Sequence, residues 1–238
     1  MNGLVPNCFD DFLISNSADH QKLELILSRK LPFPLGGKSG ILFHGTWGTG
    51  KSTLAALLPK LLETAYSDTW DMRQGVGQMP SPDPDHVQEV LFRCGGGLSS
   101  TVFTLAINKR NMHMPFWHNS QHDYYVFDEM DRLSPSAQQS LRSTMDLPRS
   151  MFFFTTNHLN KIDRGIVNRC HLVEMNQMVN QSAYVPLGLA VLQNMGVSGS
   201  AVSNANLMNL AKSAHGSMRS YIQSVIIHGL ALGGVMPK

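Results

Sequence analysis

One stretch of the chain has the residue types and spacing of a phosphate-binding loop. The pattern G-x-x-x-x-G-K-[ST] is matched at every required position by the residues Gly45, Thr46, Trp47, Gly48, Thr49, Gly50, Lys51, Ser52 and Thr53. Glycines let the backbone N–H groups of such a loop turn inward, and the start of the following helix adds positive potential. Lys51 is expected to reach the terminal phosphates and Ser52 to contact Mg²⁺. The stretch therefore predicts a binding site for a nucleoside triphosphate.

Two carboxylates follow a second apolar run. Residues 124–127 are Tyr-Tyr-Val-Phe, typical of a buried strand, and Asp128 and Glu129 come directly after them. Parallel sheets bind ligands at the carboxyl ends of their strands, so Asp128 is expected to hold Mg²⁺ opposite Ser52. Glu129 would then orient or deprotonate the attacking water. This pattern has the form of a Walker B motif and predicts hydrolysis.

Three further polar residues are candidates for contacts with the phosphates or, in the case of Asn157, with either the attacking water or the γ-phosphate. Asn157 ends another apolar run, Arg169 precedes the last predicted strand, and Arg219 lies near the start of the last predicted helix. The fixed fork of an arginine suits phosphate oxygens. Taken alone, however, an asparagine also suits a plain turn, and an arginine also suits a surface ion pair.

These residues require elements that position them. Apolar runs at 40–44, 90–94, 124–127, 151–155 and 171–175 predict strands, and a helix-forming run begins at 54 directly after the loop. Continuous apolar strands separated by helices predict a parallel sheet covered on both faces, an α/β fold of the P-loop NTPase type. Beyond 176 the pattern is helical, at 181–195, 202–213 and 217–232, and predicts a small three-helix lid. The expected domains are 1–175 and 176–238.

Three other segments complete the expected layout. A helix is expected within 9–31, ending before Pro32. Residues 67–86, rich in Pro and Gly toward their end, predict an irregular surface insertion. The loop 111–123 holds His113, His118 and His122, but its Pro115 and polar surroundings favour a flexible loop over a metal site.

Bulk properties narrow the class of protein. The chain has 238 residues, a formal net charge of +2 and only 15% charged residues, so any contact with DNA must depend on local placement of charge. Its three cysteines, Cys8, Cys94 and Cys170, are far apart and form no C-x-x-C pair, which argues against a disulfide framework and against a zinc site. No run of apolar residues is long enough to span a membrane, and no signal peptide is evident. The expected location is cytoplasmic.

With these residues in view, the sequence resembles the AAA+ ATPases over roughly residues 36–232, and within them the clamp-loader subunits of the replication factor C small-subunit and DNA polymerase III gamma type. Residues 128–131 look like the family's Walker B motif, and residues 136–146, Ser-Ala-Gln-Gln-Ser-Leu-Arg-Ser-Thr-Met-Asp, look like the helix after it. The resemblance implies that Asn157 is sensor 1 and that Arg219 is the sensor 2 arginine of the lid. It also implies that Arg169, in Asn168-Arg169-Cys170, acts on the ATP of a neighbouring subunit.

The resemblance implies a Mg²⁺-dependent ATPase, with ATP as its nucleotide, in a homo- or hetero-oligomer that carries ATP between subunits. Its expected task is to remodel a DNA replication complex, with a sliding clamp as partner. Two alternatives stay open. One is a loader of a replicative helicase or a regulator from a mobile element, which the lack of a helical collar domain before the chain ends at Lys238 favours. The other is an adaptor that binds ATP as a switch without hydrolysing it.

Overall fold

The computed structural model describes residues 6, 8–14, 16–74, 87, 89–95, 98–112, 122–176 and 181–236. Contacts between residues divide the chain into two compact units. The sheet unit comprises Ala18–His44 and Ala55–Val173, and the loop–helix unit comprises Met1–Ser17, Gly45–Leu54 and Glu174–Lys238. The predicted phosphate loop thus groups with the C-terminal helices. The division at 175 and 176 stays a prediction.

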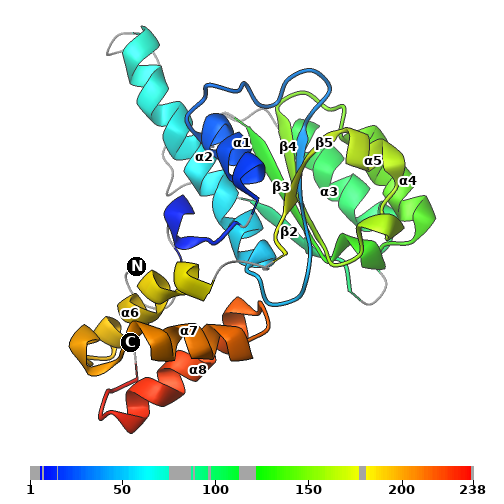
Figure 1. The fold of residues 1–238 in the computed structure, drawn as a ribbon. Coiled ribbons are helices and arrows are strands. Elements are labelled where there is room, and N and C mark those ends of the chain that lie inside the picture. Colours follow the sequence, from blue (N-terminus) through cyan, green and yellow to red (C-terminus); the bar gives the residue numbers. More distant parts are fainter. Residues whose placement is uncertain are drawn as a thin grey trace. The chain divides into compact units, whose positions relative to one another are not determined.

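The sheet unit is built on five strands. In chain order these are β1 (Gly40–His44), β2 (Val90–Arg93), β3 (Asp123–Asp128), β4 (Ser150–Thr156) and β5 (Cys170–Glu174). Their order in the sheet is β2-β3-β4-β1-β5, and the β2–β3, β3–β4 and β4–β1 pairs are parallel (Figure 1). β4 is buried along its whole length, as expected of a central strand with both faces covered. The parallel α/β sheet expected from the apolar runs is confirmed.

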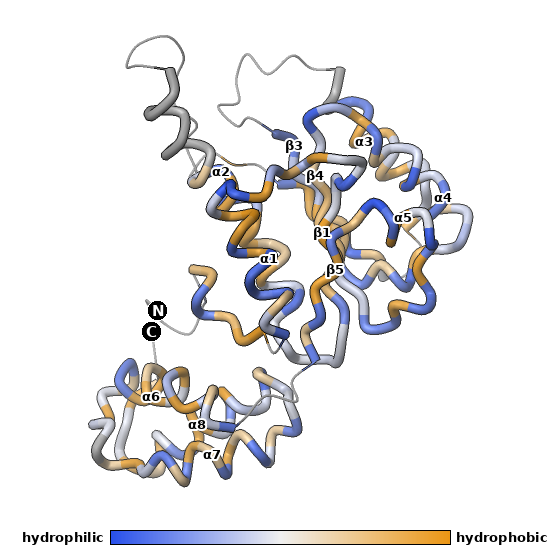
Figure 2. The backbone as a smooth tube through the Cα atoms, turned by 45° about the horizontal axis from the view of Figure 1, so that its top comes forward, coloured by the Kyte–Doolittle hydropathy of each residue, from blue (hydrophilic) through white to orange (hydrophobic). Residues whose placement is uncertain are grey.

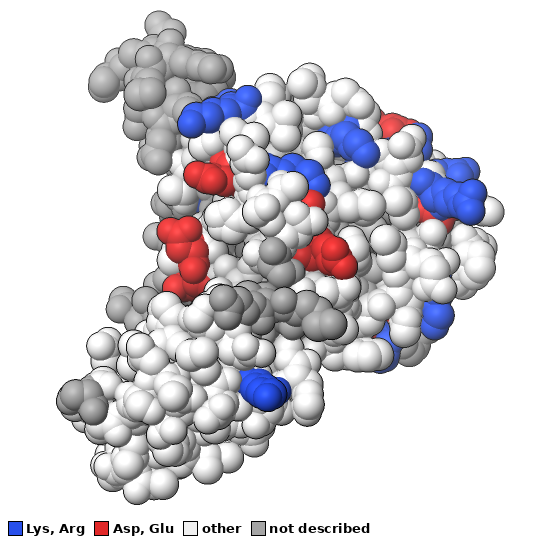
Figure 3. Space-filling model, viewed as in Figure 1, with Lys and Arg blue, Asp and Glu red and all other residues white. Residues whose placement is uncertain are grey.

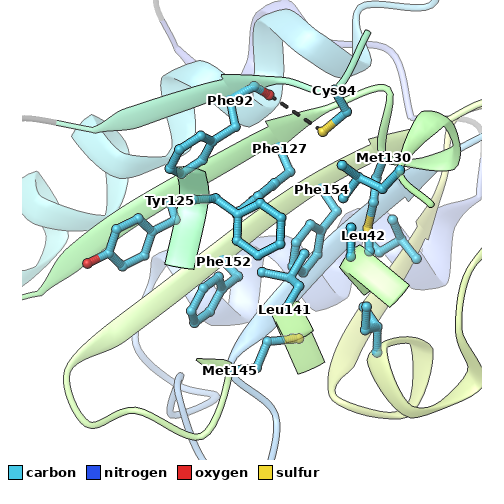
Figure 4. Packing of buried hydrophobic residues seen from close by; sticks show 14 of the residues in the cluster. Leu42, Phe92, Cys94, Tyr125, Phe127, Met130, Leu141, Met145, Phe152 and Phe154 are labelled. Carbon is cyan, nitrogen blue, oxygen red and sulfur yellow. Dashed lines mark hydrogen bonds between the residues drawn. The ribbon is translucent and has the colours of Figure 1, made fainter. Parts of the chain in front are cut away.

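Aromatic side chains fill one face of the sheet. Tyr125 stacks on Phe152 with ring centroids 5.3 Å apart, and Phe127 lies 5.6 Å from Phe154. Because alternate residues of a strand point to opposite faces, these side chains share one side. Leu141, four residues before Met145 on the adjoining helix segment, packs into the same cluster (Figure 4). The helices on this side are α3 (Ser100–Met112), α4 (Pro135–Thr144) and α5 (Arg164–Asn168).

Two other helices cover the opposite face: α1 (Ser17–Leu27) and α2 (Lys51–Gln74). On α1, Lys22 Nζ donates to the carbonyl of Leu172 in β5 at 2.9 Å. On α2, the fully buried Glu63 accepts a hydrogen bond from Tyr124 Oη of β3 at 2.5 Å. A buried hydroxyl paired in this way avoids the cost of an unsatisfied polar group, so the contact fixes α2 on the sheet.

The carboxyl ends of the strands form one edge of the sheet. β1 pairs with β4 so that His44 lies opposite Thr156, and β3 pairs with β4 so that Phe127 lies opposite Phe154. Asp128 therefore comes level with Thr155, one strand away. Short 3-10 turns leave this edge after β3 and β4, at Met130–Arg132 and Leu159–Lys161.

The C-terminal helices have a core of their own. They are the 3-10 turn Gln181–Tyr184, α6 (Val185–Asn194), the 3-10 turn Gly199–Ala201, α7 (Asn204–Ser213) and α8 (Met218–Ala231). Buried side chains from all three α-helices form one cluster, and apolar segments alternate with polar ones along each helix (Figure 2). Tyr221 Oη donates to the carbonyl of Tyr184 at 2.8 Å, and Gly188 leaves room for this ring. The helices expected after residue 176 are present.

Two expected segments differ from the structure. The helix within 9–31 is shorter, because a 3-10 turn at Phe9–Asp11 is separated from α1, which starts only at Ser17. Residues 67–74, expected to begin an irregular insertion, instead continue α2 to Gln74. The helix breakers of that segment all follow Gln74, and residues 75–86 lie outside the described residues. His113 and His118 of the expected 111–123 loop lie outside them as well.

Candidate nucleotide-binding and hydrolysis site

Three glycines give the predicted phosphate loop its backbone shape. Gly45, Gly48 and Gly50 have φ angles of 135°, 75° and 93°. Residues with a Cβ adopt such angles only with strain, so glycine is required at each turn of the loop. α2 begins at Lys51, directly after the third glycine. The loop therefore leads into a helix start, where N–H groups without helical partners face outward.

Lys51 lies against the loop that carries it. Its ammonium donates to the carbonyl of Gly45 at 3.0 Å and to Thr49 Oγ1 at 3.4 Å, and it also contacts the carbonyl of Thr46. The residue is only 6% exposed. The loop thus surrounds a cation. A phosphate chain bound here would contact both the positive charge of Lys51 and the N–H groups at the start of α2.

The first turn of α8 contacts the loop inside the loop–helix unit. The backbone N–H of Arg219 donates to the carbonyl of Gly48 at 3.2 Å. A Cβ on Gly48 would come within 2.4 Å of Ser217 Oγ. Arg219 itself is exposed. The structure therefore brings two predicted regions together, since the backbone of the expected sensor residue itself is bonded to the loop.

Asn176 is a site residue that the sequence did not indicate. Its Oδ1 accepts from the N–H of Thr46 at 2.8 Å, while its Nδ2 donates to Glu174 Oε1 at 2.7 Å. A Cβ on Gly45 would lie 2.6 Å from the same Oδ1. Asn176 thus supports the first turn of the loop. The available signal was its place, a short polar residue two positions after the last apolar strand.

In the sheet unit, Thr155 links the two predicted carboxylates. Its Oγ1 donates to Asp128 Oδ1 at 2.7 Å and accepts from the N–H of Glu129 at 2.9 Å. Thr155 is 2% exposed, so its hydroxyl has a fixed position. The carboxylate of Asp128 is therefore oriented at the edge of the sheet. Sequence reasoning missed Thr155 because a threonine inside an apolar strand looks like an ordinary strand former.

The backbone of Glu129 is in a left-handed conformation, directly after β3 ends. Its φ and ψ are 57° and 50°, in the left-handed region that few side-chain-bearing residues adopt. Its carboxylate accepts from Arg132 Nε at 2.9 Å, and both side chains remain substantially exposed, at 40% and 57%. The backbone turn projects Glu129 away from the path of β3. Action of Glu129 on a water requires this exposed pair to open.

Asn157 is held by its backbone. Asp131 Oδ1 accepts from the N–H of Asn157 at 3.3 Å and from Thr156 Oγ1 at 2.7 Å. Among the described residues, the Asn157 carboxamide makes no hydrogen bond, and the residue is half-buried. The loop after β4 is thus tied to the loop after β3. Asn157 therefore follows β4 at the same edge of the sheet at which Asp128 ends β3.

Arg169 forms a two-point ion pair with Asp146. Its Nε and Nη2 donate to the two carboxylate oxygens of Asp146, each at 3.0 Å, and Nη1 donates to the carbonyl of Gly165 at 3.3 Å. These hydrogen bonds hold the pKa of Asp146 below its usual range and raise the pKa of Arg169. The pair is therefore fully charged near neutral pH. Asp146 was not singled out from the sequence, apart from its place at the end of residues 136–146.

The cysteines are not reactive thiols. Burial, with the nearby charge of Asp128, raises the pKa of Cys94 to about 12. Burial also raises the pKa of Cys170 strongly, and Cys8, though exposed, has a raised pKa as well. Figure 4 shows Cys94 within the apolar cluster, its thiol directed at the carbonyl of Phe92. Thiolate catalysis at these positions is disfavoured, since the nucleophile is the deprotonated form.

The predicted site residues thus fall into two sets. The phosphate loop and Arg219 belong to the loop–helix unit, whereas Asp128, Glu129, Asn157 and Arg169 belong to the sheet unit. The two sets are connected through the chain. β1 of the sheet unit ends at His44, immediately before Gly45 of the loop, and α2 starts at Lys51 within the loop. β1 is also separated from β3 by β4 alone.

Surface charge, possible metal ligands and helix hydrophobicity do not indicate a different kind of site in the described residues. On the face in Figure 3, acidic and basic side chains of the described residues are interspersed over the sheet unit. Within the described parts of the chain, no cluster of three His, Cys, Asp or Glu residues suits a metal ion. None of the helices there is both long and apolar enough to cross a membrane.

Comparison with known proteins shows which proteins this chain resembles in sequence. No model of a protein family matches the chain. Replication factor C small subunit 2 of Pyrobaculum islandicum is 23% identical over 224 residues, which are 93% of this chain and 61% of that protein. Replication factor C subunit 4 of Saccharomyces cerevisiae is 26% identical over 202 residues, 82% of this chain and 55% of that protein. The chain thus spans little more than half the length of these relatives.

A solved structure has the same fold. The RuvB Holliday junction branch migration motor of Thermotoga maritima matches with a TM-score of 0.66 and 15% identity, over 98% of this chain and 68% of that one. At this identity the likeness concerns the fold. The chain is therefore distantly related in sequence to the replication factor C small subunits, and it shares the fold of RuvB.

Proposed function

We propose that the protein is a Mg²⁺-dependent ATPase of AAA+ type. The observation that carries the proposal is the loop from Gly45 to Thr53, where glycines at positive φ surround Lys51 at the start of α2. Few backbone arrangements other than a phosphate-binding loop require glycines at such angles beside a lysine and a helix start.

The residues present fit the cation. Ser52 offers a hydroxyl and Asp128 a carboxylate oriented by Thr155, and Mg²⁺ prefers such oxygen ligands. When bound with ATP, Mg²⁺ would neutralise charge on the phosphates. In the proposal, the loop and the acidic edge act on the same nucleotide, because one follows β1 and the other ends β3 of one parallel sheet.

The other residues take separate roles in the proposal. Glu129 acts as the general base for the attacking water, and Asn157 orients that water with its unengaged carboxamide. Arg219 contacts the γ-phosphate from the first turn of α8, whose backbone already bonds to Gly48. Arg169 acts on ATP held by a neighbouring subunit, so the working form is a homo- or hetero-oligomer.

The finer task that we propose is that of a clamp-loader-like subunit. The relatives named replication factor C subunits support it. The proposal includes a sliding clamp as partner, DNA contacted by the assembly and a cytoplasmic location. A loader of a replicative helicase, or a mobile-element regulator, is the second candidate with the same chemistry. Pull-down from the native cell separates the two by whether clamp or helicase is recovered.

Two variants test the chemistry. Lys51→Ala is expected to lose ATP binding in calorimetry, because the loop loses the ammonium group that its carbonyls surround. Glu129→Gln is expected to bind ATP but to hydrolyse it at least roughly 100-fold more slowly, the usual cost of losing a general base. Lys60→Ala, an exposed lysine farther along α2, serves as the matched control.

Two outcomes would count against the proposal. Wild-type ATP affinity in Lys51→Ala would show that the loop is not the nucleotide site. Wild-type protein that binds ATP but does not hydrolyse it, even with DNA and all partner proteins supplied, would favour the third candidate, a non-hydrolysing switch.

A further inference from the structure

The ion pair of Arg169 with Asp146 occupies only part of the hydrogen-bonding capacity of the guanidinium. A guanidinium carries five N–H donors, one on Nε and two on each terminal nitrogen. Among the described residues, three of them are used, one by each of the carboxylate oxygens of Asp146 and one by the carbonyl of Gly165. One N–H therefore remains on Nη1 and one on Nη2. Guanidinium N–H donors of this kind suit phosphate oxygens.

Both partners of the arginine are fixed by the core of the sheet unit. Asp146 directly follows Met145, which is 1% exposed and caps the C-terminus of α4. Gly165 lies in the first turn of α5, where its N–H donates to Asp163 Oδ1 at 2.8 Å. A Cβ on Gly165 would come within 2.4 Å of Arg142 Cδ, so the Arg142 side chain packs closely against this turn.

The ion pair is exposed, so it is expected to add little to the stability of the fold. The side chain of Asp146 is 62% exposed and that of Arg169 is 30% exposed. Ion pairs in contact with water contribute little to folding. A long arginine side chain has many rotamers, however, and a two-point carboxylate contact selects one of them.

We propose that Asp146 is a positioning residue that, together with the Gly165 carbonyl, holds the Arg169 guanidinium so that its two remaining N–H groups face the nucleotide of an adjacent subunit. The proposal rests on the proposed function of Arg169. Asp146 touches no substrate and acts only through the arginine. Without it, Arg169 keeps its charge but samples many orientations.

A double-mutant cycle on the ATP-hydrolysing assembly of the full chain tests this role. Asp146→Ala is expected to lower kcat roughly 10-fold, because misplacing a contacting group has costs of this order. KM and the melting temperature are expected to stay at wild-type values. In the Arg169→Ala background, Asp146→Ala is expected to change nothing further. Asp146→Glu, which keeps a carboxylate, is expected to recover most of kcat, and Asp146→Asn much less.

Glu24→Ala removes an equal charge from an exposed position of α1 and is the control. The positioning role is overturned if Asp146→Ala hydrolyses at the wild-type rate or faster, since a faster rate means that the carboxylate masks the arginine. It is also overturned if Asp146→Ala still lowers kcat without Arg169. Those results leave the proposed ATPase intact. A wild-type rate in Arg169→Ala instead removes the inter-subunit role of Arg169 and the positioning role together.

Discussion

The phosphate loop and the acidic edge of the sheet are built by different means. The loop depends on its backbone, with three glycines at positive φ and Lys51 bonded to the loop's own carbonyls. The acidic edge depends on side chains, with Thr155 bridging Asp128 and Glu129, and Asp131 joining the segments after β3 and β4. A site made by backbone shape demands glycine at fixed positions, whereas a site made by side-chain bonds has many sequence solutions.

The largest expected effect of this difference is at Gly48. Gly48→Ala places a Cβ within 2.4 Å of Ser217 Oγ at a φ of 75°, so the loop must change shape. We expect ATP affinity to fall by roughly 100-fold, because an L residue in this region is strained by about 1 to 2 kcal/mol before the clash is added. Calorimetric titration with ATP measures the change.

Gly36→Ala is the matched control, since Gly36 also has a positive φ of 63° but nothing within 4 Å of the added Cβ. It is expected to cost stability and to leave ATP affinity unchanged. Equal loss of affinity in both variants would mean that general destabilisation, rather than loop shape, explains the result.

The second-largest effect is expected at Thr155, on the acidic edge of the sheet. Thr155→Val removes the hydroxyl that orients Asp128 and accepts from the N–H of Glu129. We expect kcat to fall by roughly 10-fold or more, and the free energy of unfolding to fall by about 1 to 3 kcal/mol, the cost of an unsatisfied buried donor. Steady-state hydrolysis and urea denaturation measure the two. Thr155→Ser keeps the hydroxyl and should behave as wild type, and a similar loss there would refute the bridging role.

A smaller effect is expected where a side chain supports the loop. Asn176→Ala removes the acceptor of the Thr46 N–H, and ATP affinity should fall by about 3- to 10-fold, the value of one modest hydrogen bond. Asn176→Asp keeps that acceptor but faces Glu174 with a second negative charge. If both variants bind ATP as the wild type does, Asn176 contributes nothing to the loop.

The smallest effect is expected at Arg132. Its pair with Glu129 is exposed, so Arg132→Ala should change the free energy of unfolding by less than about 1 kcal/mol. Hydrolysis should rise by up to about threefold, because Glu129 no longer leaves an ion pair before acting. A lower rate would indicate that Arg132 holds Glu129 in its active position.

The same contrast explains what the sequence could predict. The strands were found because continuous apolar runs mark a buried parallel sheet, and the loop was found because its glycines and lysine have fixed spacing. Asn176, Thr155 and Asp146 were missed because each bonds to a residue distant in sequence, by 130, 27 and 23 positions. Such pairings exist only once the sheet is assembled.

Local sequence patterns also did not predict where two helical segments begin and end. Residues 9–31 have helix-forming composition, but α1 begins only at Ser17. The irregular insertion was expected from residue 67 because of the Gly and Pro residues within 67–86, but all of these follow Gln74, where α2 ends. Helix ends depend on packing as well as on residue type.

The central claim is that the loop and the acidic edge act on one Mg²⁺-bound nucleotide, and calorimetric titration of ATP with and without Mg²⁺ tests it most directly. In wild-type protein, Mg²⁺ should strengthen ATP binding. In Asp128→Asn, ATP without Mg²⁺ should bind as in wild type, and the gain from Mg²⁺ should largely disappear. An unchanged gain from Mg²⁺ in Asp128→Asn, or no ATP binding by the wild type, would contradict the claim.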